Sequence, residues 1–199
     1  MDLDRISTRT AELAASFGVR APHVVAGKVP TWSIAGLRYA IWKRPPVLRV
    51  EARFGDLPAA EQDGALAITV VAGDLYRRGA YKTVFAYVLS FSVVSFPLLY
   101  LAALHRIPSS LVFPVFMALY VCGYLLTFAL RSRRIIYRID HRVAEVMGRP
   151  VVDMMIDYGI RNDHLVRGFI RLYFTAFSPT VAQRVRRLDT AFGPRLLTA

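Results

Sequence analysis

Two long apolar runs dominate the pattern of hydrophobic and polar positions along the chain. Residues 83–104 form a stretch of 22 residues without a charge, and residues 111–130 form a second of 20. At about 1.5 Å of rise per residue, each run makes a helix of roughly 30 Å, the thickness of the hydrocarbon layer. Because only a helix satisfies its own backbone in lipid, the runs predict a hairpin of two transmembrane helices. Two such runs in succession disfavour the alternative of buried core helices in a soluble domain.

The charges beside the two runs predict the orientation of the hairpin. The connector, residues 105–110, has one full positive charge, and the outer flanks together have seven, namely Arg77, Arg78, Lys82, Arg131, Arg133, Arg134 and Arg138. Since cytoplasmic flanks carry the excess of Lys and Arg, we expect the connector outside and both termini in the cytoplasm. This describes a multi-pass protein of the cell (plasma or inner) membrane.

The remaining segments predict short elements on either side of the hairpin. Apolar spacing indicates a helix at 4–16, and three β-rich runs separated by Gly and Pro suggest a small antiparallel sheet or ribbon, at 23–26, 38–42 and 47–50. A long segment from Leu57 to Arg78 is predicted as a helix, although its β-branched middle, 65–72, also suits a strand. Three further helices are expected after the hairpin: one that ends at Gly148, one at 151–158, and a basic amphipathic one at 180–188.

The composition is typical of a membrane protein and indicates which kind of partner the chain binds. The chain is 55% hydrophobic with a mean hydropathy of +0.37 and a net charge of +12. Because the basic residues cluster beside the apolar runs, the charge indicates a lipid bilayer as partner and no nucleic acid. The single cysteine, Cys122, excludes an intrachain disulfide and a thiolate zinc cluster. The first 22 residues lack the apolar core and cleavage site of a signal peptide.

The order of these elements resembles a known family. A short β segment is followed by a helix that ends in Arg77-Arg78, the hairpin, a helix with Asp140, and a Pro-led helix with Arg184. Over roughly residues 18–190, this order resembles the HtpX-like and CAAX-prenyl-protease family of membrane zinc metallopeptidases. The resemblance implies a mostly α integral membrane protein whose hairpin joins a cytoplasmic α+β, zincin-like domain with a small sheet. The chain then divides into cytoplasmic halves at 1–82 and 131–199 around membrane helices at 83–104 and 111–130.

The resemblance also places the family's zinc motif on this sequence, where its chemistry is missing. In the family, two His of an H-E-x-x-H helix and a later Glu hold zinc, and the motif's Glu is the general base. Aligned by Gly73 and the Arg-Arg exit, the first His, the base and the second His fall on Val70, Val71 and Asp74. The Glu ligand, four residues before the family's Asp, falls on Ile136. The family's Asp, its His-Pro pair and its final Arg fall on Asp140, Ser178-Pro179 and Arg184.

These replacements predict a protein without catalytic residues, bound metal or cofactor. One carboxylate cannot make a tetrahedral zinc site, which needs about three protein ligands. Without a base at Val71, even a bound metal would lack its proton acceptor. Val70, Val71 and Ile136 would instead fill the vacated pocket with methyl groups.

Two aspartates are left in this apolar setting. Asp74 and Asp140 are expected to face each other, and two buried carboxylates need a shared proton, a cation or an arginine between them. Arg184 is the candidate to bridge them, and the alternative is that Asp140 only caps or pairs locally. His141 is expected to point about 100° away from Asp140 around the helix.

Three functions remain open on this sequence. The first is an inactive metallopeptidase homologue, or pseudoprotease, that binds a membrane protein, an extended peptide or an active relative. The second is an active membrane metallopeptidase that binds zinc through an unrecognised set among Asp74, Asp140, His141 and His164. The third is a hairpin protein that acts by helix–helix association, with small residues for close packing at Gly123, Ala102, Ala103 and Ala118. The sequence indicates neither a client nor an oligomeric state.

Overall fold

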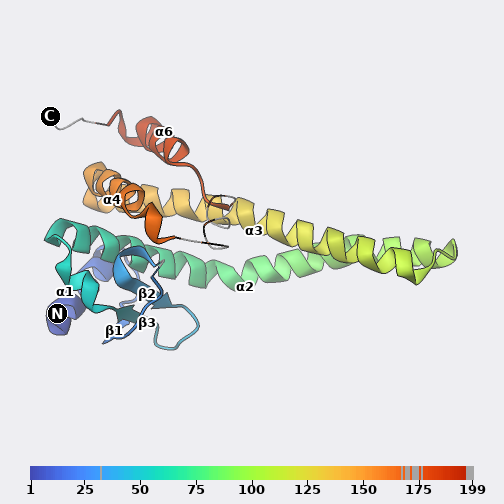
Figure 1. The fold of residues 1–199 in the computed structure, drawn as a ribbon, viewed down its shortest axis with the longest axis horizontal. Helices are drawn as coiled ribbons and strands as arrows, with labels where there is room; N and C mark the ends of the chain where they lie inside the picture. The colour runs from blue at the N-terminus through green and yellow to red at the C-terminus, as the bar shows by residue number, and fades with distance from the viewer. Residues whose placement is uncertain (32, 167, 169–170, 172–174, 176, 196–199) are drawn as a thin grey trace.

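Two long helices form the frame of the molecule. The structure is a computed structural model that describes residues 1–199 except 32, 167, 169–170, 172–174, 176 and 196–199. Helix α2 (Ala59–Leu104) runs outward and helix α3 (Ser109–Met147) returns beside it, so that their far halves project as a hairpin (Figure 1). The other labelled elements gather at the opposite end. The last residues of the predicted C-terminal half, 196–199, lie outside the described part.

Each long helix joins two elements that the sequence predicts separately. Helix α2 unites the segment before the hairpin with the first apolar run, and its 46 residues span about 70 Å at the standard rise. Residues 65–72 lie within it, so the helix prediction for this ambiguous stretch is confirmed and the strand alternative is wrong. Helix α3 unites the second apolar run with the helix that ends, as predicted, at Gly148. Because Ser109 and Ser110 join α3, the connector is shorter than expected.

The small sheet is mixed, which corrects the antiparallel prediction. Its strands β1 (His23–Ala26), β2 (Leu37–Ala40) and β3 (Val47–Val50) are arranged in the order β1-β3-β2. Strand β2 pairs antiparallel with β3, whereas β1 pairs parallel with it. A run of β-branched residues identifies a strand but contains no information about its direction. Strand β2 also ends at Ala40 instead of Trp42, since residues 41–46 form the connection to β3.

Three shorter helices and three 3-10 turns complete the described elements. Helix α1 (Leu3–Ser16) and helix α4 (Arg149–Arg161) match the predicted helices, with Pro150 in the first turn of α4. Helix α6 (Val181–Phe192) begins at a capping box, in which Thr180 and Gln183 each bond the other's backbone N–H. The turns are η1 (Ile34–Gly36), η2 (Ala52–Asp56) and η3 (Asp163–Leu165).

The molecule has two apolar regions with opposite exposure. One hydrophobic core lies among α1, the sheet, the first part of α2, the last part of α3 and α4, with fully buried members such as Leu48, Phe54, Val71, Val143 and Val152. By contrast, only 11% of the apolar window in Phe85–Leu104 is buried, and none of the window in Ser110–Met147. Both of these helices are long and apolar enough to span a membrane.

Aromatic rings hold the two arms of the hairpin together. The Tyr87 hydroxyl on α2 donates to the Tyr120 carbonyl on α3, and the Phe91 ring meets the Phe116 and Tyr120 rings edge-on at 5.0 and 4.7 Å between centroids. Edge-to-face pairs at this separation are favourable beyond the area that they bury. A Cβ at Gly123 would lie 3.5 Å from the Tyr87 hydroxyl oxygen, an ordinary contact. The arms therefore pack through rings, and the absence of a side chain at Gly123 is not needed for their approach.

The contact between α2 and the sheet depends on a glycine. A Cβ at Gly73 would lie 2.6 Å from three carbons of the Tyr39 ring in β2, a distance at which something must shift. Gly73 therefore lets the edge strand β2 lie against α2, a role that the family alignment does not indicate.

We expect Gly73→Ala to lower the free energy of unfolding by about 1–3 kcal/mol, the usual cost of overpacking. The measurement is urea or thermal unfolding of the full chain in detergent. Gly159→Ala on α4 is the matched control, because a Cβ there meets no atom within 4 Å. Alanine is a better helix former than glycine, so the control should gain up to about 1 kcal/mol. Equal changes in the free energy of unfolding for the two variants would contradict the proposed role of the contact between Gly73 and Tyr39.

Candidate functional site

A buried ion pair joins α3 to α6. The side chain of Asp140 is only 4% exposed, and its two carboxylate oxygens accept from Arg184 Nε at 2.7 Å and Nη2 at 2.6 Å. This fork-to-carboxylate geometry supplies two charge-assisted hydrogen bonds, which compensate the carboxylate for the loss of water. Asp140 and Arg184, placed by the sequence as remnants of the family site, are thus in direct contact.

The start of α6 positions the arginine. Pro179 is buried and Ser178 is half-buried just before the helix, and the capping box fixes the first turn at Thr180. Arg184 lies one turn further on, where its backbone N–H donates to the Thr180 carbonyl. The Ser178-Pro179 step therefore sets where α6 begins and contributes no group to the ion pair.

A cavity of about 400 Å³ opens beside this pair, lined by Tyr137, Asp140, His141, Arg184, Arg187, Leu188, Thr190, Ala191 and Phe192. The Arg187 guanidinium carbon lies 4.1 Å from the centroid of the Tyr137 ring, and the His141 and Phe192 rings are 5.1 Å apart. His141 is exposed, with its Nδ1 3.3 Å from a Glu145 oxygen, which agrees with its expected direction away from Asp140. Aromatic faces beside cations suit binding better than proton transfer.

The second aspartate has a different environment from the one expected. Arg78 Nε, four residues along α2, donates to Asp74 Oδ1 at 2.9 Å. The other oxygen, Oδ2, is buried and has no hydrogen-bond partner within the described part of the chain. The charge of Asp74 also affects Tyr39 in β2. The pKa of Tyr39 is raised, chiefly by burial; Arg77 lowers it in part, and the Asp74 charge adds to the increase.

The expected bridge between the two aspartates is therefore not seen. Among the residues that the structure describes, Arg184 pairs with Asp140, whereas Asp74 pairs with Arg78 of its own helix. The expectation overlooked that an arginine four residues away on the same helix is the nearest available partner.

Of the four positions onto which the resemblance places the zinc motif, three have aliphatic side chains, and these differ in burial. Val70 and Val71 are both 0% exposed. Ile136 is only half-buried, because Ile135 and Ile139 take the core-facing positions of α3. Within the described residues, no three His, Cys, Asp or Glu side chains are grouped so that they could hold a metal ion. Val70 and Val71 thus occupy core volume, and Ile136 lies at its margin.

Sequence reasoning missed a second buried charge cluster, at the junction of α4 and α6. Arg149, 9% exposed, donates to Asp153 at 3.1 Å and to Asp189 at 2.6 Å, and Arg195 pairs with Asp157 and lies 3.8 Å from Asp153. The signal that could have found it is the spacing of 149, 153 and 157, which puts three charges on one face of a helix. The cluster fixes α6 against α4 and so supports the Arg184 contact.

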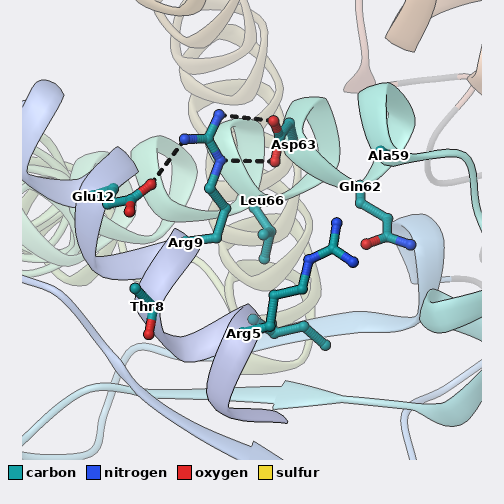
Figure 2. Close-up of a pocket in the computed structure, with 9 residues that line it drawn as sticks. Arg5, Thr8, Arg9, Glu12, Ala59, Gln62, Asp63 and Leu66 are labelled. Atoms are coloured by element: carbon teal, nitrogen blue, oxygen red, sulfur yellow. Dashed lines mark hydrogen bonds and ion pairs between the residues drawn. The ribbon is translucent and has the colours of Figure 1, made fainter. Parts of the chain in front are cut away.

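A third polar cluster joins α1 to α2 and lines a cavity of about 340 Å³. Figure 2 shows the Arg9 guanidinium between Glu12 and Asp63, with hydrogen bonds of 2.9 Å to Glu12 and of 2.9 and 2.7 Å to Asp63. The two carboxylates raise the pKa of Arg9, which is 43% exposed. Exposed ion pairs of this kind contribute at most about 1 kcal/mol each to the free energy of unfolding. We therefore interpret the cluster as a structural connection between α1 and α2.

Comparison of the chain with models of protein families, with curated proteins and with solved structures finds no match. The resemblance to metallopeptidases therefore rests on the order of elements and the aligned positions in the sequence alone.

We expect Asp140→Asn to lower the free energy of unfolding by about 3–5 kcal/mol, because it leaves the Arg184 charge without its partner in a largely buried site. Thermal unfolding of the full chain in detergent is the measurement. Glu12→Gln is the control, since it removes one partner of an exposed pair and should cost less than about 1 kcal/mol. A cost at Asp140 no larger than the cost at Glu12 would show that the pair does not hold α6.

Proposed function

We propose that this chain is a membrane-anchored, non-catalytic relative of the zinc metallopeptidases that acts by binding an extended peptide or a membrane-protein client. The observation that supports it most directly is the complete burial of Val70 and Val71. These are the positions that the alignment gives to a zinc ligand and to the general base. Aliphatic carbons packed into the core there leave no room for a water activated by metal.

The peptide would lie along the edge of the sheet. In the described sheet β2 is an edge strand, and it lies beside the degenerate motif because Tyr39 packs on Gly73. An edge strand offers unpaired N–H and C=O groups to a further strand, which is how many domains bind extended peptides. Asp74 is the next residue after Gly73 on α2, and its charge acts on the Tyr39 ring of β2.

The hairpin would anchor the protein by crossing the cell membrane twice, with both ends in the cytoplasm. The apolar windows of α2 and α3 are almost wholly exposed, with Phe85 and Tyr100 at 70% each and Phe96 at 72%. Core helices of a soluble protein would be buried instead. Helices α1 and α6 both lie at the end opposite the hairpin tip, which agrees with cytoplasmic placement of both halves (Figure 1).

The exposed outer face of the same hairpin favours a second function, association with other membrane helices. Its aromatic contacts leave large side chains such as Phe113 and Leu126 free to meet a partner, at 66% and 61% exposure. In that case a chain cut down to the hairpin would keep the activity, whereas the peptide-binding proposal requires the sheet.

We expect Ser110→Cys, in a Cys122→Ser background, to react with a membrane-impermeant maleimide added to right-side-out vesicles. Ser7→Cys on α1 should react only after the vesicles are permeabilised. The opposite pattern would reverse the topology, and equal labelling of both before permeabilisation would rule out the hairpin as an anchor.

We expect a variant that restores the family motif, Val70→His, Val71→Glu, Asp74→His and Ile136→Glu, to bind about one zinc ion per chain, since three ligands and water complete the site. The control moves the first three changes back by two residues, to Ile68→His, Thr69→Glu and Ala72→His, and keeps Ile136→Glu. This shift turns the motif about 200° around the helix. Metal content is measured on protein whose folded state is checked by its unfolding transition. A folded restored variant without zinc would refute the alignment, and stoichiometric zinc in the unmodified protein would favour an active enzyme.

A further inference from the structure

A basic groove lies where the two long helices leave the core and enter the apolar hairpin. It has a volume of about 610 Å³ and is lined by Leu75, Arg78, Gly79, Lys82, Thr127, Leu130, Arg131, Arg134, Ile135 and Arg138. On α2 the lining residues recur at intervals of three and four, and so do those on α3. Each set therefore forms one continuous face of its helix, and the two faces enclose the groove.

The floor of the groove is formed where Arg131 of α3 lies over Gly79 of α2, which has no side chain. A Cβ at Gly79 would lie 2.1 Å from an Arg131 guanidinium nitrogen, so this arginine reaches across the floor of the groove over the glycine backbone. Arg78 is 65% exposed although it pairs with Asp74. Lys82, Arg134 and Arg138 are exposed, and no ion pair joins them to a carboxylate in the described part of the chain.

The lining contains five cations and no carboxylate, and of the five only Arg78 has an ion-pair partner in the described part of the chain, so the site is positively charged. Toward the hairpin the lining includes Leu130, which is 51% exposed, and Thr127, beside Lys82. The groove thus offers cations along its length and exposed hydrocarbon where it meets the hairpin, which suits the headgroup and first acyl carbons of a phospholipid. Arginine is suited to this task because its planar fork of donors fits phosphate oxygens.

We propose that this groove binds the phosphate headgroup of one anionic phospholipid of the cytoplasmic leaflet, an inference that rests on the membrane placement proposed above. The headgroup lies between Arg134 and Arg138 of α3 and Lys82 of α2, with Arg131 beneath it. An acyl chain follows the exposed surface at Leu130 toward the hairpin. The bound lipid offsets the repulsion among five like charges, and it fixes the depth at which the two helices enter the bilayer.

The test is native mass spectrometry of the full chain in detergent, titrated with phosphatidylglycerol or with phosphatidylcholine. The unmodified protein should retain one phosphatidylglycerol in preference to phosphatidylcholine. Arg134→Gln with Arg138→Gln should weaken phosphatidylglycerol binding about ten- to thirtyfold, given the usual contribution of a cation near an anionic headgroup. Arg20→Gln with Arg186→Gln removes the same charge from exposed sites outside the groove and should change binding less than twofold.

Several outcomes would overturn the proposal. These are equal binding of the two lipids, equal losses in the two double variants, and displacement of phosphatidylglycerol by an equal concentration of inorganic phosphate. If the double variant of α3 does not fold, Lys82→Gln on α2 replaces it, with an expected loss of about fivefold. Carbonate extraction of membranes separates this proposal from the one on which it rests. A protein that is extracted refutes both, and a protein that stays in the membrane without a phosphatidylglycerol preference refutes only the lipid site.

Discussion

The structure depends on the unbroken backbone of α2 and α3 across the boundary between the polar end and the apolar hairpin. A helix satisfies each interior N–H and C=O within itself, so the same element can be packed in a protein core at one end and surrounded by hydrocarbon at the other. Helix α2 has valines in the core and exposed phenylalanines in the hairpin, with a band of arginine and lysine between them. The other described elements are arranged around the core-facing parts of these two helices.

Buried charges then decide how the C-terminal half is attached. Helix α6 meets α3 through Asp140 and Arg184, and it meets α4 through Asp189 and Arg149. In each of these two ion pairs at least one partner is almost fully buried. The apolar contribution of α6 to the core is small, because Leu188 is its only buried residue among those described. Such contacts specify position more than they add stability, because each charge must first lose its water. The docking of α6 is thus more sensitive to single substitutions than the docking of α1, which buries four residues.

The elements could largely be predicted from the sequence, and the contacts between them only in part. Apolar periodicity and charge-free length predicted both hairpin helices. Of the bridge that Arg184 was expected to make between Asp140 and Asp74, only the contact with Asp140 is present. The pair of Asp74 with Arg78 follows from their spacing of four residues on one helix, which the family analogy does not take into account. The parallel pairing of β1 was missed because alternation is the same for either strand direction. The role of Gly73 against Tyr39, and the cluster at Arg149, depend on approaches between distant segments that no local pattern contains.

Because α2 is one continuous helix, it connects the hairpin mechanically to the core. Val71 and Asp74 lie on the same rigid rod as the exposed residues from Phe85 onward, and the described helix has no proline before Pro97. If the hairpin spans a bilayer as proposed, a bilayer thicker or thinner than its apolar length would change the tilt of the helices. Since β2 packs on α2 where Tyr39 meets Gly73, a change of tilt would also turn the edge of the sheet relative to the bilayer. The thickness of the surrounding membrane would in this way set the orientation of a surface that lies outside it.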